Sequence, residues 1–514
     1  MSFNATSSAP RRNSIAGLRW FIVAILFLGT TVNYVDRITV ASLKDILQKD
    51  IGWDEAGYGW LNFAFQLAYA FMFPVSGRLL DKYGVRTVMT WAVVVWSLAA
   101  MGHSLATTAV GFALARFALG VGESANFPAC VKAVAQWFPK KERALATGIF
   151  NTGTNVGAMM IGPVALLAAY AGWRAAFVLI GSCGLLWLVL WLAFYRAPED
   201  HPRLSEKERV YIVSDRPAAT PKQHIPWPSL LRYRQAWAVF VGKLLTDPVW
   251  WFYLYWLPPY LRSQHVLTPD KFALLITWPY IMADIGSIAG GWFSSHLMKR
   301  GMPVGRARQI AMGIAAIALP LSIFSVATDN VYWALVFISL ATGCHQAWSA
   351  NLFTLASDMF PERAVGSVVG FASMCGAIGG LIMTLVAGGM LQWLGSYVPL
   401  FIAAGVMHPL AWVLIRLLSG KAMTPANLDN GLRTYASRGL LVGGGVVAVI
   451  GVTGGAWFST HWSEVLAATR GSVSAATSGI GASILLSLIG VALVYASRDV
   501  SHKLTPSVGS GKND

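Results

Sequence analysis

The sequence predicts an all-helical protein that crosses a membrane many times, and three observations support that fold class. Hydrophobic residues make up 55% of the 514 residues and charged residues only 12%, whereas charged residues are about 25% of a soluble globular protein. Apolar stretches recur along the chain, each long enough for a bilayer-spanning helix of roughly 20 residues. Lysine and arginine are concentrated in the short loops between these stretches.

The apolar stretches predict two sets of six helices. The first set covers residues 18–41, 56–77, 87–106, 108–137, 144–170 and 174–196, and the second covers residues 237–261, 272–297, 307–327, 331–358, 366–392 and 398–418. We therefore expect one six-helix half over residues 18–196 and another over residues 237–418. Residues 1–17 are expected to be an uncleaved tail, and the charged, proline-rich residues 197–236 a linker with one short surface helix.

The chain continues with an extension over residues 419–514. Residues 439–458 and 476–496 are each apolar and long enough to span a bilayer at about 1.5 Å per residue. They predict two extra transmembrane helices. The first is rich in glycine, so a re-entrant or loosely packed segment is an alternative. Neither carries a buried charge, and we assign them no functional role.

The positions of the basic residues predict how the chain lies in the membrane. Loops on the cytoplasmic side are enriched in lysine and arginine. The loops after the second, fourth and eighth predicted helices are basic, and they share a side with the N-terminal tail and the linker. Both termini are therefore expected in the cytoplasm. The same distribution accounts for the net charge of +16 without a nucleic-acid partner.

The chain also contains a weak internal repeat. Phe138-Pro139-Lys140-Lys141-Glu142-Arg143-Ala144 follows the fourth predicted helix, and Phe360-Pro361-Glu362-Arg363-Ala364 follows the tenth. Each opens a glycine-rich helix. Two halves related by an axis along the membrane normal, with a binding site between them near the midplane, are expected from such a repeat.

A polar row interrupts the first predicted helix. Asn33, Asp36 and Arg37 are spaced so that all three can share one helical face. Ionisable side chains at bilayer depth are costly, so they usually face a protein interior or a water-filled cavity and mark a functional site. The alternative is an ion pair that only holds this helix against a neighbour.

A second polar row lies in the fourth predicted helix. Arg116 and Glu123 are seven residues apart, which places them two turns apart on one stripe, and Gly120 between them leaves room for a ligand or a close helix. The geometry lets Arg116 reach Asp36 or Glu123. Pro128 predicts a kink just beyond this row. If the two rows meet, two acids and two arginines share one chamber.

These side chains suit the handling of an anion and a proton. A guanidinium in a low-dielectric cavity favours bidentate pairing with a carboxylate, so Arg37 is the candidate clamp for an anionic substrate. Burial disfavours the charged forms of Asp36 and Glu123, whereas nearby arginines favour them. An acid balanced between these effects can gain or lose a proton as the cavity opens to either side, which is what a proton-coupled carrier requires.

The loop after the second predicted helix carries a family motif. Gly77-Arg78-Leu79-Leu80-Asp81-Lys82-Tyr83-Gly84-Val85-Arg86 resembles the signature loop of the major facilitator superfamily, with the match at both glycines, Asp81 and Arg86. The resemblance covers residues 18–418. It implies the major facilitator fold of two six-helix halves, to which the two trailing helices are an addition, and a gating role for the four matched residues: Gly77, Asp81, Gly84 and Arg86.

Further stretches narrow the resemblance to one branch. Asn33-Tyr34-Val35-Asp36-Arg37, with the spacing of Arg116 and Glu123, is similar to the anion:cation symporters of that superfamily. The stretches 246–253, 283–287 and 345–351 are most similar to bacterial hexuronate transporters. This resemblance implies a carboxylate-binding Arg37, proton-linked acids and a lined cavity, with these roles falling on Arg37, Asp36, Glu123, Tyr69 and Asn351.

Several further residues are candidate contacts to the substrate. Asn33 and Arg116 belong to the two polar rows. Asp247 could line the cavity from the seventh predicted helix, although a polar cap where Pro248 breaks that helix is an alternative. Lys243, nearer the helix end, is expected to extend its ammonium towards water.

Together these features predict a monomeric, proton-coupled symporter that imports a sugar acid, a hexuronate such as galacturonate or glucuronate, across the bacterial inner membrane by alternating access. Its partners are the small organic anion, protons and the lipid bilayer. The alternatives are symport of another organic anion, namely an aldonate such as galactonate, an aldarate, tartrate or an aromatic acid, and a transporter-like sensor. No metal-cluster spacing, catalytic triad or phosphate-binding loop occurs in the sequence. An enzyme is therefore not expected, and no cofactor or metal is expected either.

Overall fold

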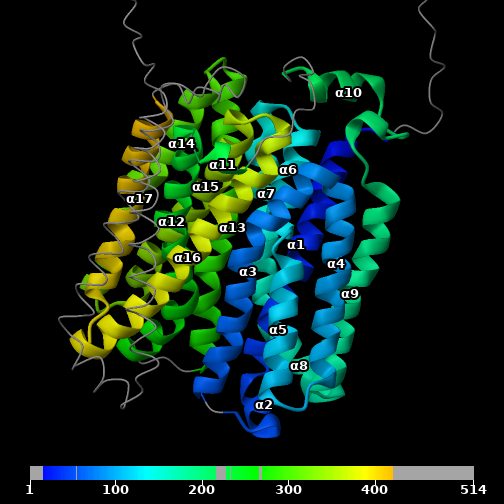
Figure 1. Ribbon diagram of the computed structural model, residues 1–514. Coiled ribbons are helices and arrows are strands. Elements are labelled where there is room, and N and C mark those ends of the chain that lie inside the picture. The colour runs from blue at the N-terminus through cyan, green and yellow to red at the C-terminus, as the bar shows by residue number, and fades with distance from the viewer. Residues whose placement is uncertain (1–14, 54, 216–226, 232, 266–268, 421–514) are drawn as a thin grey trace, which may run out of the picture.

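The computed structural model describes residues 15–53, 55–215, 227–231, 233–265 and 269–420. This part of the chain consists of helices and their connections, and it contains no strand. The helices run roughly alongside one another in a single bundle (Figure 1). The predicted helices at 439–458 and 476–496, and both chain termini, lie outside the described residues.

The first group of helices precedes the linker. Its elements are α1 (Leu18–Ser42), α2 (Lys44–Ile51), α3 (Glu55–Tyr83), α4 (Val85–Gly102), η1 (His103–Leu105), α5 (Ala109–Glu123), α6 (Asn126–Trp137), α7 (Lys140–Met159), α8 (Ile161–Ala171) and α9 (Trp173–Phe194). The short α2 lies at one end of the bundle (Figure 1).

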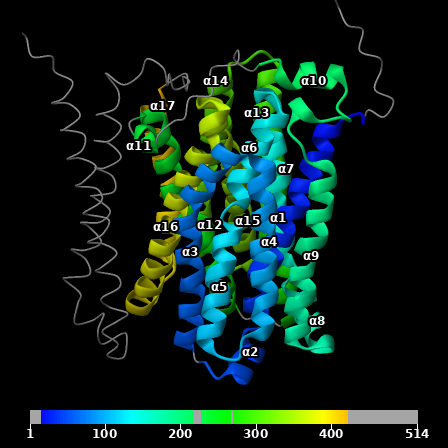
Figure 2. The ribbon, with the colours of Figure 1, turned by 45° about the vertical axis from the view of Figure 1, so that its right-hand side comes forward.

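The linker and the second group follow. Their elements are η2 (Pro198–Asp200), α10 (Glu206–Val213), α11 (Trp227–Leu230), α12 (Arg234–Gln264), α13 (Pro269–Lys299), α14 (Val304–Ala318), η3 (Leu319–Ala327), α15 (Val331–Met359), α16 (Glu362–Leu394) and α17 (Val398–Ser419). The helix α10 confirms the expected short helix in the linker. It lies across the end of the bundle opposite α2, and we call that end the linker end (Figure 2).

Length and composition support a membrane location. Seven of the described helices are long and apolar enough to cross a membrane, or eight if α7 and α8, which are bent by 44° at their junction, form one span. Other long helices are more polar. The second half of α15, for example, buries His345, Asn351 and Asp358 inside the protein. The prediction of an all-helical, multi-pass membrane protein is therefore confirmed.

The fourth predicted helix is broken just beyond its polar row. The helix is interrupted at Ser124 and Ala125, where α5 ends and α6 begins. Pro128 is the third residue of α6. Proline is tolerated in the first turn of a helix because the amides there have no partner within the helix. The predicted kink just beyond the polar row is therefore present, as a break at Ser124, whose carbonyl lies four residues before Pro128 and cannot be bonded by it.

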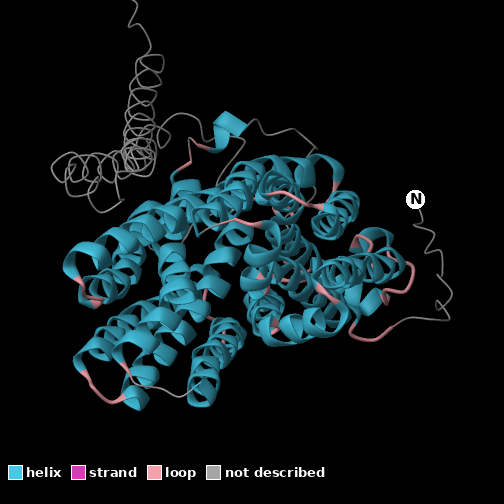
Figure 3. Ribbon diagram, turned by 90° about the horizontal axis from the view of Figure 1, so that it is seen from below, coloured by secondary structure: helices cyan, strands magenta, loops and turns pink. Residues whose placement is uncertain are grey.

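The two groups of helices meet along two long contacts. α3 packs along α16, and α7 packs along α13. Glycines allow these close approaches: a side chain at Gly77 would overlap the backbone of Gly366, and one at Gly148 would overlap the backbone of Ser287. Seen from below, the helices surround the middle of the bundle (Figure 3). Residues from both groups can therefore share a site between the halves.

Candidate functional site

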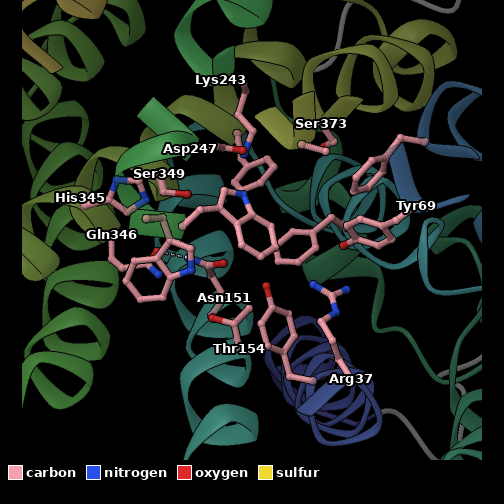
Figure 4. A pocket seen from close by; sticks show the side chains of 17 residues that line it. Arg37, Tyr69, Asn151, Thr154, Lys243, Asp247, His345, Gln346, Ser349 and Ser373 are labelled. Carbon is pink, nitrogen blue, oxygen red and sulfur yellow. Dashed lines mark hydrogen bonds and ion pairs between the residues drawn. The ribbon is translucent and has the colours of Figure 1, made fainter. Parts of the chain in front are cut away.

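A cavity of about 70 Å³ lies between the two groups of helices, and Figure 4 shows the side chains that line it. Its lining combines aromatic rings, hydroxyls, amides and three charged side chains. The lining residues are Tyr34, Arg37, Tyr69, Phe73, Phe127, Asn151, Thr154, Lys243, Asp247, Trp250, Trp251, His345, Gln346, Ser349, Phe353, Ser373 and Ala377.

Arg37 projects from α1 into this cavity and is held there by an acid. Its Nε and Nη2 both donate to Oε2 of Glu123, at 2.9 and 2.8 Å. Nη2 also donates to Oδ1 of Asn33 at 3.4 Å. The guanidinium carbon lies 4.5 Å from the ring centres of both Tyr34 and Tyr69. The cation is therefore fixed between a carboxylate and two aromatic faces, which favour a positive charge.

The two predicted proton-linked acids are buried beside Arg37. Glu123 offers only Oε2 to Arg37, and its Oε1 has no hydrogen-bond partner among the described residues. Asp36 is 2% exposed, and within the same part of the chain neither of its carboxylate oxygens has a partner. A buried, unpaired carboxylate costs several kcal/mol, and taking up a proton relieves that cost.

Arg116 lies one layer further from the cavity than expected. Its Nη1 donates to the backbone carbonyl of Arg37 at 3.2 Å, and its Nη2 donates to Oδ1 of Asn62 at 3.0 Å. It makes no hydrogen bond to Asp36 or Glu123 and is not among the lining residues of the described structure. The helical spacing permits Arg116 to reach either acid, but in the described structure its donors bond the Arg37 backbone and Asn62 instead. Its contact supports the backbone that carries Arg37.

Asn351 is also placed away from the cavity lining. Its Nδ2 donates to the carbonyls of Ala347 and Gly290, at 2.9 and 3.1 Å, and its Oδ1 accepts a bond from Nη1 of Arg308 at 3.4 Å. The side-chain amide of Asn351 is thus hydrogen-bonded to backbone carbonyls and to a buried arginine. These bonds connect α15 to α13 and α14. Ser349, on the same helix, lines the cavity instead.

Lys243 and Asp247 line the cavity from α12. The Lys243 Nζ lies 2.7 Å from Oδ2 of Asp247, and it also lies 4.1 Å from the ring centre of Phe353. The expectation that Lys243 extends to water is wrong, because its side chain is only 6% exposed. α12 continues past Pro248. Asp247 is therefore a lining residue and not a cap at a broken helix.

Two lining residues on α7 were missed from the sequence. Asn151 donates through Nδ2 to Oε1 of Gln346 at 2.7 Å, which joins α7 to α15 across the cavity. Thr154 lies one turn later on the same helix. The run Asn151-Thr152-Gly153-Thr154-Asn155 interrupts an apolar stretch, as the row around Arg37 does. The same signal could have found both residues.

A buried histidine pair supports one side of the cavity. Nδ1 of His345 lies 3.1 Å from Nε2 of His408. The ring of Trp250 is stacked on His345, with ring centres 5.5 Å apart. His345 is thus a lining residue that holds an aromatic neighbour in place.

Two residues of the signature loop connect the halves. Asp81, at the end of α3, accepts bonds from the backbone amides of Gly366 and Ser367, at 3.0 and 2.8 Å, and from the Ser367 hydroxyl at 2.6 Å. Lys132 of α6 donates to Oδ1 of Asp81, the oxygen that also accepts the Gly366 amide, at 2.6 Å. Gly77, one turn earlier, permits the close approach to α16. These contacts hold the halves together at the linker end.

The other two residues of the loop act within the first group of helices. Gly84 has a φ of 80°, a backbone conformation that favours glycine, and its amide donates to the carbonyl of Leu80 at 3.1 Å. It therefore allows the turn from α3 into α4. Arg86 donates to the carbonyl of Leu192 at 2.8 Å, which links α4 to α9.

The repeated loops after α6 and α15 form further bonds at the linker end. Nη1 of Arg143 donates to the carbonyl of Ser357 at 2.7 Å, and Nη2 of Arg308 donates to the carbonyl of Lys140 at 3.0 Å. In the linker, Tyr211 donates to Glu142 at 2.8 Å. Burial, together with this hydrogen bond, raises the pKa of Tyr211 to about 12, so the hydroxyl stays a donor.

A helical bundle of two groups of helices, joined at one end and enclosing a charged cavity near its middle, is the architecture of a secondary transporter. The match to known families agrees with this class. Residues 26–384 match the model of the major facilitator superfamily, and the chain belongs to that superfamily. It is therefore a membrane transporter and not an enzyme.

Relatives of this chain include several sugar-acid transporters. It is 31% identical to the hexuronate transporter of Escherichia coli (strain K12) over 78% of this chain and 94% of that protein. It is 34% identical to the galacturonate transporter of Dickeya chrysanthemi over 55% of this chain and 84% of that protein. A protein of Escherichia coli (strain K12) described as a probable galactarate/D-glucarate transporter is 29% identical, over 78% and 95%.

Solved structures share the fold. The proton:xylose symporter XylE superposes with a TM-score of 0.65 at 14% identity, covering 80% of this chain and 98% of that one. The fucose:proton symporter FucP of E. coli superposes with a TM-score of 0.58 at 17% identity, covering 78% and 99%. The predicted major facilitator fold is therefore confirmed.

Proposed function

We propose that this protein is a proton-coupled symporter that imports a sugar acid, with a hexuronate such as galacturonate or glucuronate as its substrate. The observation that carries the proposal is Arg37, a cation that lines a cavity between the halves and is paired with the buried Glu123. The relatives that transport hexuronate and galacturonate support the choice of substrate.

The Arg37–Glu123 pair offers a way to couple the anion to a proton. While Glu123 is ionised, it occupies the guanidinium of Arg37. When Glu123 takes up a proton it loses its charge, and a substrate carboxylate can replace it with two charge-assisted hydrogen bonds. Binding of the anion and binding of the proton therefore favour one another.

Asp36 is proposed as a second proton carrier. Its carboxylate is buried without a hydrogen-bond partner in the described structure, so it is expected to remain ionised only at a cost. Two acids allow more than one proton for each monoanion, in which case net positive charge moves inward. A substrate-evoked current in proteoliposomes would support that stoichiometry, and an electroneutral signal would exclude it.

The remaining parts are assigned to the alternating-access cycle. We place the six-helix halves at residues 18–196 and 237–418 in a bacterial inner membrane, with the linker end in the cytoplasm and the monomer as the working unit. Asp81 and Gly77 join α3 to α16 at that end, so they act as a gate that must open to release substrate. Gly84 and Arg86 hold the loop that carries them.

Counterflow of labelled galacturonate into proteoliposomes tests the proposal. We expect uptake against unlabelled galacturonate, and accumulation when an inward proton gradient is imposed. Collapsing that gradient should abolish accumulation but leave counterflow. Absence of counterflow with galacturonate and with glucuronate, in protein that is folded and inserted, would overturn the hexuronate assignment. Accumulation that ignores the gradient would overturn proton coupling.

A further inference from the structure

Lys243 and Asp247 form an ion pair on the wall of the cavity, one helical turn apart on α12. The two partners are not equally open. The Lys243 side chain is 6% exposed and the Asp247 side chain is 19% exposed. The ammonium is enclosed by the carboxylate and by the Phe353 ring. The carboxylate is therefore the member of the pair that a molecule in the cavity meets first.

The position of the Asp247 carboxylate is set by a second helix. A side chain at Gly376 on α16 would overlap the carboxylate of Asp247, and one at Gly380 would overlap the ring of Trp251. The two glycines thus leave space on α16 for these side chains of α12. The carboxylate therefore lies between two packed helices, α12 and α16. It is next to aromatic rings that can stack on the face of a sugar.

This pair lies across the cavity from Arg37. Arg37 belongs to α1 of the first half, whereas Lys243 and Asp247 belong to α12 of the second. Figure 4 shows them on different sides of the lining side chains. A sugar acid that places its carboxylate on Arg37 therefore directs its other end towards the Lys243–Asp247 pair.

We infer that the Lys243–Asp247 pair is a specificity subsite that binds hydroxyl groups at the uncharged end of a monocarboxylic sugar acid and rejects a second carboxylate. This inference rests on the proposed function. With the ion pair intact, Asp247 accepts a hydrogen bond from a hydroxyl and Lys243 remains neutralised. A second carboxylate would instead lie against the open carboxylate of Asp247, and like charges in contact oppose binding strongly.

The rival outcome is a dicarboxylate held at both ends. In that case Lys243 would leave Asp247 and bind the second carboxylate, with Asp247 neutralised by a proton. The enclosure of the ammonium by Phe353 and Asp247 disfavours this arrangement. The two outcomes differ in which sugar acids bind, so ligand choice separates them.

The test compares the dissociation constants of three sugar acids for the purified full-length protein at neutral pH. Galacturonate is a monocarboxylate, galactonate is an open-chain monocarboxylate, and galactarate is the open-chain dicarboxylate. Galactonate and galactarate share chain length, so their ratio of dissociation constants isolates the second carboxylate. We expect galactarate to bind at least about tenfold more weakly than galactonate, from the cost of a like-charge contact.

Substitutions of Lys243 and Asp247 then test whether this ion pair causes the preference for galactonate over galactarate. In Asp247→Asn the open carboxylate is removed and Lys243 loses its neutralising partner. We expect the galactarate-to-galactonate ratio to fall at least about tenfold. In the double variant Lys243→Gln, Asp247→Asn the cation is also gone, so only the part of this gain that comes from removing the like charge should remain. Asp284→Asn is the matched control, because it removes a carboxylate of α13 that bonds Asn155 and does not line the cavity.

Each result decides the inference. Equal binding of galactarate and galactonate by the unaltered protein overturns it, and this measurement needs no variant that might fail to fold. An unchanged ratio of the galactarate and galactonate dissociation constants in Asp247→Asn also overturns the inference. If that variant still binds galacturonate, the proposed function stays in place. A shift of equal size in Asp284→Asn would show that charge removal anywhere in the bundle has this effect. Failure of the unaltered protein to bind all three acids would overturn the proposed function itself.

Discussion

Asp81→Asn tests whether one carboxylate holds the two halves together at the linker end. Asp81 accepts three hydrogen bonds from α16, at 3.0, 2.8 and 2.6 Å. Its fourth partner, Lys132, belongs to the same group of helices as Asp81 and stays with it when the halves separate. Only the three bonds to α16 therefore differ between the closed and the open state.

The size of the effect follows from these bonds. A hydrogen bond to a charged group contributes about 1.5–3 kcal/mol. An asparagine oxygen can keep at most two of these bonds in a weaker, neutral form, and the NH₂ group cannot accept the third. We expect the closed state to lose about 2–4 kcal/mol relative to the open state. That loss shifts the ratio of open to closed molecules towards the open state by between about 30-fold and about 700-fold.

Pulsed electron resonance can measure this shift. Spin labels at Tyr83 on α3 and Arg300 after α13, both exposed at the linker end, report the separation of the halves in a background without the four native cysteines. Asp81→Asn should raise the fraction of long distances. Lys132→Gln, which leaves the bonds to α16 in place, should change it far less. A ratio of populations that moves by less than about threefold in Asp81→Asn would refute the reasoning.

Three further predictions concern the site. Arg37→Lys should weaken galacturonate binding by about ten- to a hundredfold in a thermal-shift titration, because an ammonium cannot reproduce the two-pronged bond; unchanged affinity would place the clamp elsewhere. Glu123→Gln should keep counterflow but lose most of the accumulation driven by a proton gradient, because an amide cannot carry the proton and only Asp36 remains; accumulation equal to that of the unaltered protein would rule out Glu123 as a carrier. Asn351→Ala should lower unfolding stability by about 1–3 kcal/mol, because its bonds are to backbone and to Arg308. It should leave galacturonate affinity within about twofold, and a large loss of affinity with normal stability would instead make Asn351 a direct contact.

The sequence identified the charged residues of the first half because of their context. Asp, Glu and Arg are rare at bilayer depth, so Asp36, Arg37 and Glu123 stand out without any structure. The periodicity of helices placed Arg37 and Asn33 on one face, and the structure has them bonded at 3.4 Å. The break near Pro128 could not be located in this way, because proline is compatible with both a kink and the first turn of a new helix.

Partners at long range were harder to predict than the residues themselves. The helical spacing permitted Arg116 to reach an acid, yet it bonds the backbone of Arg37 and the amide of Asn62. Lys243 was expected at the water interface, yet it pairs with Asp247. Each choice depends on which helix packs opposite, and sequence spacing describes only one helix at a time.

The sequence by itself determined that this protein is a helical membrane protein and which acids and arginines are placed at bilayer depth, because hydropathy and charge are properties of each segment. Only the tertiary structure decided which side chains line the cavity and which ones support it. Asn351 and Ser349 lie two residues apart on α15, but only Ser349 lines the cavity, whereas Asn351 packs into the neighbouring helices. That difference arises from the rotation of α15 against α13 and α14, a packing arrangement that involves contacts far apart in the chain.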